Sequence, residues 1–454
     1  MSDVKLIPFL AGSSAGAAFQ RKHFHRRDAE AQRRGETTES LRLRVSTVNI
    51  FWFRLVRLRR EENDRGKPTP HNSGQPPALA VKTESRAYSR LTTVVLALRN
   101  TLATLGRRTA PTAPQRILIA HHLLLGDTLM LTPLLAKLRE RYPAADIVMA
   151  TPRPCAPLYA QQPYGIRAIA FDPRDPATLT ALRAAGSYDL AIVPGDNRFA
   201  WLARAAGAKW VVAFAGDRPA SKNWAVDELI PYPDAPAAWG DMVAGLVAGP
   251  APRPYRTTDW PAPECAPFER PATPYCVLHV GASSPLKAWP TANWRALVES
   301  LERRGFSVVW SGGRGEDRLV AEIDPEGRYP SYAAKLNLSQ LWHLLAGAGL
   351  LVCPDTGVAH LGRLTGTPTV TLFGPGSATI CGAGDFWRDA PYRAVTVADF
   401  SCRNQNILFR RTLPWVRRCG RGLRECAAPA CMQAITVNSV LEAVANLTED
   451  APCV

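Results

Sequence analysis

The chain has 454 residues, of which 46% are hydrophobic and 21% charged, and its formal net charge is +16. This length and apolar content fit two ordinary globular domains plus a tail, and ten cysteines in so long a chain exclude a small disulfide scaffold. No apolar run reaches the roughly 20 residues that a membrane-spanning helix needs, so we expect a cytoplasmic protein.

The positive charge is concentrated at the N-terminus. Residues 1–110 hold 21 Lys and Arg against 9 Asp and Glu, whereas the remaining residues hold 34 against 30. Arg, Ser, Thr and Gln dominate residues 1–113, and the proline-containing stretch 67–77 is typical of a disordered linker. We therefore expect a basic, largely disordered extension with two short helices, over residues 45–60 and 88–105. A start codon assigned too far upstream is an alternative origin for it.

The first of these helices suggests a role for the extension. Phe51, Trp52 and Phe53 lie beside several arginines, and an apolar and basic segment of this kind can lie on a membrane surface. We expect peripheral contact with an anionic membrane and no part in the chemistry. Nucleic acid is not expected as a partner, because no motif that reads RNA or DNA accompanies the charge.

From residue 116 the sequence alternates between apolar runs and helical periodicity. Strands are predicted over residues 116–120, 146–150, 168–171 and 189–193, and helices over residues 129–141, 177–185 and 199–206. Such alternation with short links predicts a parallel sheet covered by helices on both faces. We assign residues 114–255 to this N-terminal domain and the proline-rich residues 256–274 to a stiff linker.

The same alternation restarts after the linker. Strands are predicted over residues 275–280, 307–310, 350–353 and 369–373, and helices over residues 294–304, 316–323, 339–348 (with Ser339 as N-cap) and 358–364. We assign residues 275–436 to a C-terminal domain and residues 437–454 to a closing helix and tail. Two doubly wound domains joined by a linker place a ligand cleft between them, at the carboxyl ends of the strands.

The sharpest motif begins where the strand over residues 350–353 ends. Asp355 and Thr356 can cap the helix that follows, and Gly357 lets the backbone approach a ligand closely. The amides of that first turn form an anion site, aided by the helix dipole, and His360 lies one turn further along. The same residues also fit a simple capped turn beside a structural histidine, and the pattern alone leaves both interpretations open.

A second motif follows the strand over residues 275–280. Gly281 and Ser283 stand at the strand end, where hydroxyl and amide groups can donate to phosphate oxygens. Lys287 supplies a compact positive charge in the same loop, suited to a departing diphosphate. A lone lysine in a loop is more often a solvated surface residue, so this motif indicates a phosphate site only in combination with the first motif.

A third motif closes the first strand of the N-terminal domain. Gly126 and Asp127 lie at the strand end, at the mouth of the expected cleft. A carboxylate there can act as general base on an acceptor hydroxyl. The alternative role for this aspartate is a helix N-cap.

Together these motifs resemble glycosyltransferase family 9, the ADP-heptose:lipopolysaccharide heptosyltransferases, over residues 116–447. The resemblance implies the α/β fold called GT-B, in which two Rossmann-like doubly wound domains face a central cleft. It implies that Asp127 is the catalytic carboxylate and that Lys287 contacts the donor phosphates. It also implies a set of further donor-site residues: Asp355, Thr356, Gly357 and His360, with Glu316 on the nucleoside side.

Departures from the family pattern concern the substrates and the C-terminal region. His121 and His122 stand where the family usually has a basic residue, and residues 376–381 replace its Thr-Asp-Pro run. The arginine-rich segment over residues 400–428 is enlarged. The cysteines of this region lack a CxxC pair, so we expect no metal site at Cys402, Cys419, Cys426 and Cys431.

The sequence therefore predicts an inverting, metal-independent glycosyl transfer without a cofactor. Asp127 accepts the acceptor's hydroxyl proton, while Ser283, Lys287 and the helix N-terminus stabilise the leaving nucleoside diphosphate. The expected donor is an ADP-heptose-like nucleotide sugar, and the expected acceptor is a lipopolysaccharide core or related lipid-linked glycan at the inner face of the cytoplasmic membrane. There are two alternatives. The enzyme could use another nucleotide sugar as donor, or the chain could be a catalytically silent nucleotide-binding or scaffold protein of the same fold. A Rossmann dehydrogenase is disfavoured because no GxGxxG follows a strand.

Overall fold

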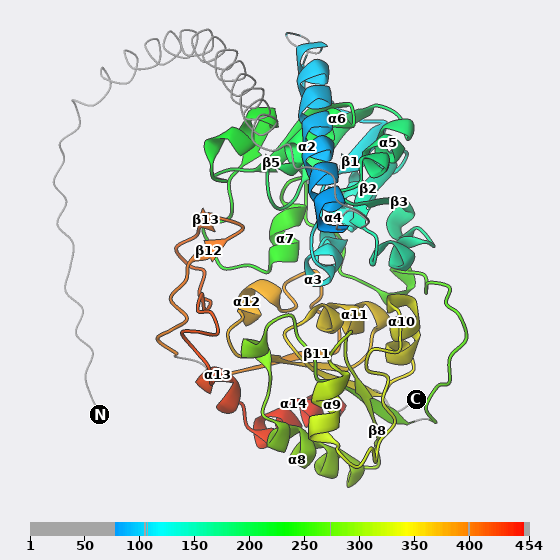
Figure 1. The fold of residues 1–454 in the computed structure, drawn as a ribbon, viewed down its shortest axis with the longest axis vertical. Helices are drawn as coiled ribbons and strands as arrows, with labels where there is room; N and C mark the ends of the chain where they lie inside the picture. The colour runs from blue at the N-terminus through cyan, green and yellow to red at the C-terminus, as the bar shows by residue number, and fades with distance from the viewer. Residues whose placement is uncertain (1–77, 104–105, 107, 273, 398–399, 449–454) are drawn as a thin grey trace, which may run out of the picture. The chain divides into compact units, whose positions relative to one another are not determined.

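The computed structural model describes residues 78–103, 106, 108–272, 274–397 and 400–448. The predicted helix over residues 45–60 and the stretch 67–77 lie outside them. The described residues belong to one compact unit, Pro77–Val454, drawn in Figure 1. None of the helices among them is long and apolar enough to cross a bilayer.

The N-terminal half is built on a six-stranded parallel sheet in the order β3-β2-β1-β4-β5-β6. Its strands are mostly buried apolar runs, as expected for a parallel sheet with both faces covered. They are β1 (Arg116–Ile119), β2 (Asp146–Pro152), β3 (Ile166–Phe171), β4 (Tyr188–Val193), β5 (Ala208–Phe214) and β6 (Glu228–Ile230). The strand order switches between β1 and β4, and ligands bind such sheets at the carboxyl ends of the strands beside the switch.

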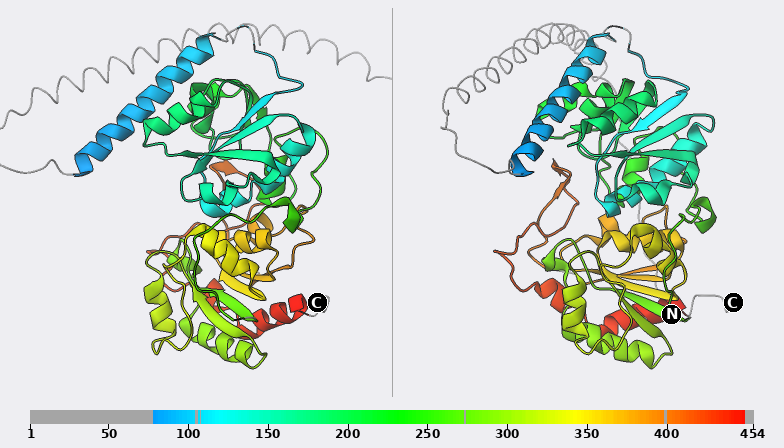
Figure 2. Two further views of the ribbon diagram at one scale, coloured as in Figure 1. Left: turned by 90° about the vertical axis from the view of Figure 1, so that its right-hand side faces the viewer. Right: turned by 45° about the vertical axis from the view of Figure 1, so that its right-hand side comes forward.

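Helices cover both faces of this sheet, as Figure 2 shows. They are α2 (Ala78–Ala103), α3 (Leu125–Leu129), α4 (Thr132–Arg141), α5 (Pro176–Ala184), α6 (Phe199–Ala205) and α7 (Trp239–Ala244). The helix predicted over residues 129–141 is interrupted, and α3 ends at Leu129 before α4 begins. Pro133 explains the break, because proline has no amide proton for the carbonyl of Leu129 and its ring would clash with that carbonyl.

The C-terminal half has a second parallel sheet, in the order β11-β10-β9-β7-β8. Its strands are β7 (Tyr275–His279), β8 (Ser307–Ser311), β9 (Leu350–Pro354), β10 (Thr369–Phe373) and β11 (Tyr392–Thr396), and a separate two-stranded hairpin pairs β12 (Ile407–Leu408) with β13 (Arg411–Thr412). Its helices are α8 (Thr291–Glu302), α9 (Asp317–Ile323), α10 (Leu338–Ala346), α11 (Gly357–Thr365), α12 (Ala378–Cys381), α13 (Ala430–Gln433) and α14 (Val437–Thr448). The order switches between β7 and β9, so the loops after these two strands meet at a ligand-binding position.

The N-cap predicted for α10 is wrong by two positions. Asn337, not Ser339, caps the helix by accepting from the amide of Gln340 at 2.9 Å, and the Gln340 side chain accepts from the amide of Asn337 at 3.1 Å. This reciprocal arrangement satisfies two donors at the helix start, whereas Ser339 is buried inside the first turn.

The proline-rich linker and Tyr255, which directly precedes it, form contacts with both halves. The indole nitrogen of Trp260 donates to the carbonyl of Leu158 at 3.1 Å, and its ring packs against Tyr159 and Trp342, with centroids 5.0 and 6.1 Å apart. Tyr255 donates its hydroxyl to the carbonyl of Leu364 at 2.6 Å. These contacts make one buried apolar cluster continuous from the first sheet to α10 and α11.

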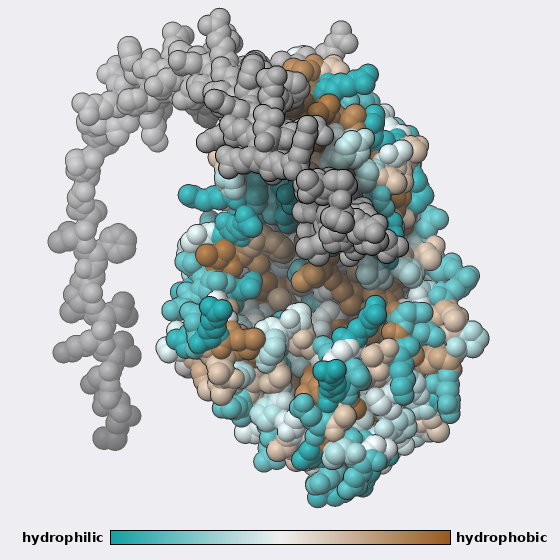
Figure 3. All heavy atoms as spheres, in the orientation of Figure 1, coloured by the Kyte–Doolittle hydropathy of each residue, from teal (hydrophilic) through white to brown (hydrophobic). Residues whose placement is uncertain are grey.

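The predicted helix near residue 88 exists, but it begins earlier in the extension, as α2. Its inward side packs on the N-terminal half, where Ala97 is fully buried. Ser89 donates to the carbonyl of Pro173 at 2.9 Å, and the Asn100 side chain donates to the carbonyl of Arg204 at 2.8 Å. The outward side is apolar and exposed, as Figure 3 shows near the top of the molecule, and carries Tyr88, Leu91, Val94, Val95 and Leu102.

Candidate functional site

Asp127 lies in the first turn of α3, directly after β1. Leu124 occupies the N-cap position of α3 and makes no side-chain cap, so Asp127 does not have the alternative role of helix cap. Burial raises the pKa of the Asp127 carboxyl to about 6, and the charge of Asp355 acts in the same direction. Lys287 and Arg418 oppose this rise. Asp127 is therefore a half-buried carboxyl group whose pKa also depends on charges of the C-terminal half.

Lys287 and Asp355 form an ion pair between the ends of β7 and β9. The ammonium of Lys287 donates to the Asp355 carboxylate at 2.7 Å and to the Asp355 backbone carbonyl at 2.7 Å. Ser284, the N-cap of the short turn that holds Lys287, accepts from the amide of Leu286 at 3.4 Å. Lys287 is thus held in place beside Asp355, with its side chain 22% exposed, and is not a freely solvated lysine.

Because its carboxylate binds Lys287, Asp355 does not cap α11. Thr356 occupies the N-cap position with extended backbone angles, φ −144° and ψ 167°, and makes no side-chain cap. The prediction that these two side chains cap the helix is therefore wrong. The amides at the start of this nine-residue helix are left without a capping side chain, which is the arrangement that attracts an anion.

Gly357 and Gly126 bring the two halves into backbone contact. A Cβ atom on Gly357 would lie 2.9 Å from Cγ of Leu125 and 3.0 Å from the amide nitrogen of Gly126. A Cβ atom on Gly126 would lie 3.1 Å from Cδ2 of His360. Both glycines are therefore required by the close approach of α3 to α11, which Figure 1 shows facing each other.

His360 is a buried, neutral imidazole at this junction. Burial, followed by the charges of Arg363 and Lys287, holds the pKa of His360 well below its usual value. The Arg363 guanidinium donates to Nδ1 of His360, which leaves the proton on Nε2. This ring can therefore offer an N–H donor to a ligand but no positive charge.

Glu316 and Ser283 lie at the edge of this arrangement. The Glu316 carboxylate accepts from the amide of Gly313, and it occupies the space that a Cβ atom on Gly281 would need. Ser283 is exposed in the loop after β7. The structure thus brings Asp127, Lys287, Asp355, Gly357 and His360 together at the two switch points, with Glu316 and Ser283 beside β7.

Two features were missed or altered by sequence reasoning. Arg418 acts on Asp127 from a segment far along the chain, and the only sequence signal for it was the enlarged arginine-rich region. His121, one of the two histidines predicted to stand at the position of a basic residue, is 1% exposed, and burial lowers its pKa to about 3, whereas His122 is exposed. Nδ1 of His121 accepts from the amide of Leu123 at 3.2 Å, and its Nε2 has no hydrogen-bond partner. His121 therefore carries no positive charge.

Two parallel sheets whose switch points face one another, each supplying polar groups to one junction, define a GT-B fold. The model of glycosyltransferase family 9 (heptosyltransferase) matches residues 179–386. The lipopolysaccharide heptosyltransferase 1 of Pseudomonas aeruginosa is 32% identical over 217 residues, which make up 43% of this chain and 57% of that relative. The match thus spans little more than half of the relative's length.

Solved structures agree on the fold. The Escherichia coli ADP-heptose lipopolysaccharide heptosyltransferase II superposes with a TM-score of 0.55 at 21% identity, over 74% of this chain and 100% of that one. A family 9 glycosyl transferase from Veillonella parvula gives a TM-score of 0.57 at 17% identity, over 74% and 98%. The chain is thus similar to glycosyltransferase family 9 over residues 179–386 and shares the fold of its solved members.

Proposed function

We propose that this protein transfers a heptose, or a similar sugar, from an ADP-sugar to a lipopolysaccharide core or related lipid-linked glycan. One observation carries the proposal: Asp127, a half-buried carboxyl group of the N-terminal half, lies near enough to Lys287 and Asp355 for both charges to act on its pKa, and Gly126 before it contacts Gly357 at the uncapped start of α11. A base for an acceptor hydroxyl and a site for a leaving diphosphate are thus opposed across one junction.

The proposed reaction is a single displacement that inverts the anomeric centre and needs no metal. Asp127 takes the proton of the acceptor hydroxyl as its oxygen forms a bond to the anomeric carbon of the donor. The bond from that carbon to the diphosphate breaks, and the electron pair leaves with the nucleoside diphosphate. Lys287, Ser283 and the amides at the start of α11 stabilise the negative charge that develops there.

The substrate classes follow from the relatives. The Pseudomonas relative is named as a lipopolysaccharide heptosyltransferase, and the superposed Escherichia coli structure is named for ADP-heptose. For this chain, ADP-heptose and a lipid-linked core saccharide are therefore the substrates to test. Such an acceptor resides in the membrane, so we propose that the protein works at the inner face of the cytoplasmic membrane.

The test is a transfer assay with the full chain, a panel of nucleotide sugars and a heptose-free lipid A–core acceptor. We expect product with ADP-heptose and none above background with Asp127→Asn. A second function is favoured by His121 and His122, which stand where the resemblance implies a basic residue, because His121 is buried and neutral. If the chain binds ADP by calorimetry but transfers no sugar from any donor, it is a silent nucleotide-binding protein of this fold.

A further inference from the structure

Residues 400–429, between β11 and α13, contact the N-terminal half beside the loop that precedes α3. We call them the connecting segment, and Figure 1 shows it running from β12 and β13 to α13. At its tip, the guanidinium of Arg411 donates to the carbonyl of Gly195 at 3.1 Å. A Cβ atom on Gly195 would lie 3.1 Å from Cδ2 of Leu123 and 3.7 Å from Cε1 of Phe409. The tip therefore lies close to the loop that leads from β1 into α3.

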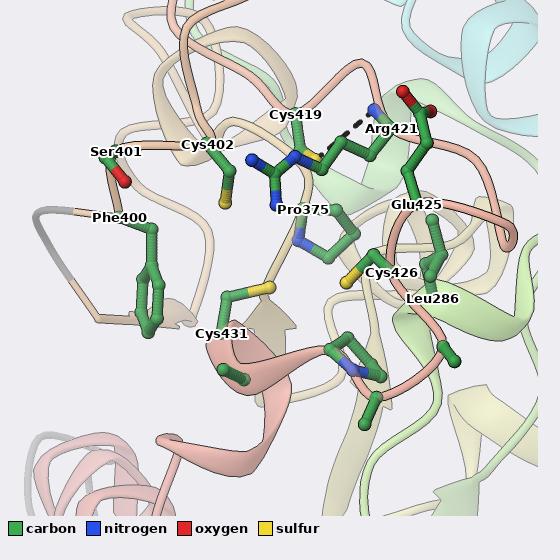
Figure 4. A pocket seen from close by; sticks show the side chains of 14 residues that line it. Leu286, Pro375, Phe400, Ser401, Cys402, Cys419, Arg421, Glu425, Cys426 and Cys431 are labelled. Atoms are coloured by element: carbon green, nitrogen blue, oxygen red, sulfur yellow. Dashed lines mark hydrogen bonds between the residues drawn. The ribbon is translucent and has the colours of Figure 1, made fainter.

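The other end of the connecting segment contacts the loops of the C-terminal half. The amide of Cys419 donates to the carbonyl of Pro375 at 3.0 Å, and Figure 4 shows these two residues side by side. A Cβ atom on Gly376, the next residue, would clash with the Asp355 carboxylate. Cys419 and Leu286, from the loop after β7, line one cavity of about 430 Å³. The segment therefore passes beside the loops that hold the ion pair of the junction.

Arg418 lies between these two attachments. Its amide donates to the carbonyl of Gln405 at 3.2 Å, and its carbonyl accepts from the amide of Gln405 at 3.0 Å, so its backbone is held by antiparallel pairing. The residue is half-buried. Within the described part of the chain, no hydrogen bond, ion pair or ring contact involves its guanidinium. Its fork of N–H donors is therefore available to a ligand.

The charges at the junction are unbalanced without Arg418. Lys287 is already paired with the Asp355 carboxylate at 2.7 Å, and Asp127 adds a second carboxyl group. Burial raises the pKa of Asp127 to about 6, Asp355 adds to this rise, and Lys287 and Arg418 oppose it. Arg418 is thus close enough to act on the same carboxyl group. Without its charge, a leaving diphosphate would meet two acidic residues and one lysine.

Arg363 is also near this junction, but its donors are occupied. It is 2% exposed, and its two terminal nitrogens donate to the carbonyl of Gly382 at 2.6 Å and to Nδ1 of His360. Its guanidinium carbon lies 4.9 Å from the centre of the Tyr392 ring. Its Nε has no partner but is fully buried. Arg363 is therefore less suited than Arg418 to meet a ligand.

We propose that Arg418 binds the diphosphate of the nucleotide-sugar donor, together with Lys287 and the amides at the start of α11. The assignment rests on the proposed function and adds to it a residue of the connecting segment. A planar guanidinium can donate two parallel hydrogen bonds to one phosphate group. Its charge stabilises the negative charge that develops as the bond between sugar and diphosphate breaks. Arg418 neither gives nor takes a proton in this step.

The first test is calorimetric titration of the full chain with ADP and with adenosine, which lacks the phosphates. Arg418→Ala should weaken ADP binding by about tenfold or more, the fold-change of one charge-assisted hydrogen bond, and leave adenosine binding unchanged. Arg418→Lys keeps the charge without the planar fork and should lose less affinity. The matched control is Arg424→Ala, which removes an exposed arginine of the same segment and should bind ADP as wild type does.

Arg418→Gln gives the same comparison if the alanine variant does not fold, because it keeps most of the side chain without the charge. Steady-state transfer kinetics then distinguish the donor diphosphate from an anionic group of the acceptor. We expect Arg418→Ala to raise the KM for ADP-heptose and to leave the KM for the acceptor near the wild-type value.

The outcomes separate this assignment from the proposed function. An Arg418→Ala variant that binds ADP like wild type, or that raises only the KM for the acceptor, overturns the assignment while the proposed transfer stands. If wild type binds ADP but transfers no sugar, the transfer fails and the calorimetry still decides on Arg418. A wild-type chain that binds no ADP overturns both.

Discussion

Asp127 is a carboxyl group on which burial and three neighbouring charges act at once. If it is the general base, Asp127→Asn should lower turnover by about 100-fold or more and leave the affinity for ADP nearly unchanged, because the amide cannot accept the proton but keeps the shape. Steady-state kinetics with ADP-heptose and calorimetry with ADP measure the two effects. Near-normal turnover in the variant would remove Asp127 from the mechanism.

The raised pKa of Asp127 also links activity and stability to pH. Activity should fall as the pH drops below about 6, since protonation removes the base. The folded chain keeps the proton that the unfolded chain releases between pH 3.8 and about 6, so the free energy of unfolding falls as pH rises through that window. Asp127→Asn removes this penalty and should raise Tm at pH 8 but not at pH 4. A lower Tm at both pH values would contradict the burial argument.

Lys287 neutralises both Asp355 and, at longer range, Asp127. Lys287→Ala should weaken ADP binding by about 1.5–3 kcal/mol, the scale of a charge-assisted hydrogen bond. It should also move the acid limit of activity to higher pH, because Lys287 holds the pKa of Asp127 down. Lys222→Ala is the matched control, since it breaks ion pairs to Asp196 and Asp217 in the N-terminal half. Equal ADP affinity in Lys287→Ala and wild type would rule out the phosphate contact.

At the scale of elements, α3 and α11 meet through two glycines. A methyl group at position 357 would lie 2.9 Å from Cγ of Leu125 and 3.0 Å from the amide nitrogen of Gly126. Gly357→Ala should therefore reduce the free energy of unfolding by about 1–3 kcal/mol, the usual cost of overpacking. Gly422→Ala, where the nearest atom is a flexible Glu425 oxygen at 3.8 Å, is the control and should have little effect. Denaturant unfolding measures the free energy of unfolding of both variants, and equal values would contradict this prediction.

The helix α2 decides where the chain can be shortened. Its inward side contacts the N-terminal half through Ala97, Ser89 and Asn100. Removing residues 1–77 should leave Tm unchanged, whereas removing residues 1–113 should lower it, because the second deletion strips α2 from the domain. Equal Tm values for the two truncations would show that α2 adds nothing to the fold. Vesicle binding that weakens with residues 1–77 removed would assign membrane attachment to the basic tail.

Local sequence patterns predicted the elements that lie deep in the two sheets. Strands β1 and β9 are continuous buried runs and end near the predicted positions. By contrast, β6 was missed, because this three-residue edge strand is largely exposed and has no apolar run to detect. The hydrogen bond from Lys287 to Asp355 spans 68 residues, so a local pattern predicts the strand ends but not which side chains meet there.

At the scale of the whole molecule, the sequence predicted the two doubly wound halves but not the path of residues 400–429. Nothing in the periodicity of residues 400–429 indicates that Arg411 reaches the N-terminal half or that Arg418 acts on Asp127. Such contacts depend on how the chain returns across the two sheets. The predicted site residues therefore lie near the expected strand ends, their roles stay predictions, and the contacts that surround them were not predicted.

Arg411 allows a test of whether residues 400–429 connect the two halves. Its guanidinium is 3% exposed, donates to Asn197 at 2.7 Å and lies 3.7 Å from the Asp217 carboxylate, which is itself fully buried. Arg411→Ala leaves Asp217 with Lys222 as its cationic partner at 3.2 Å, but it removes the hydrogen bonds to Asn197 and to the carbonyls of Ala215 and Gly195, and should cost about 1–3 kcal/mol of unfolding free energy. Arg424→Ala removes the same charge from an exposed position shortly before α13 and should leave the free energy of unfolding almost unchanged. Urea unfolding measures the stability of both variants. Equal stability would mean that Arg411 does not hold the two halves together, and the expected difference would assign the connection between them to Arg411.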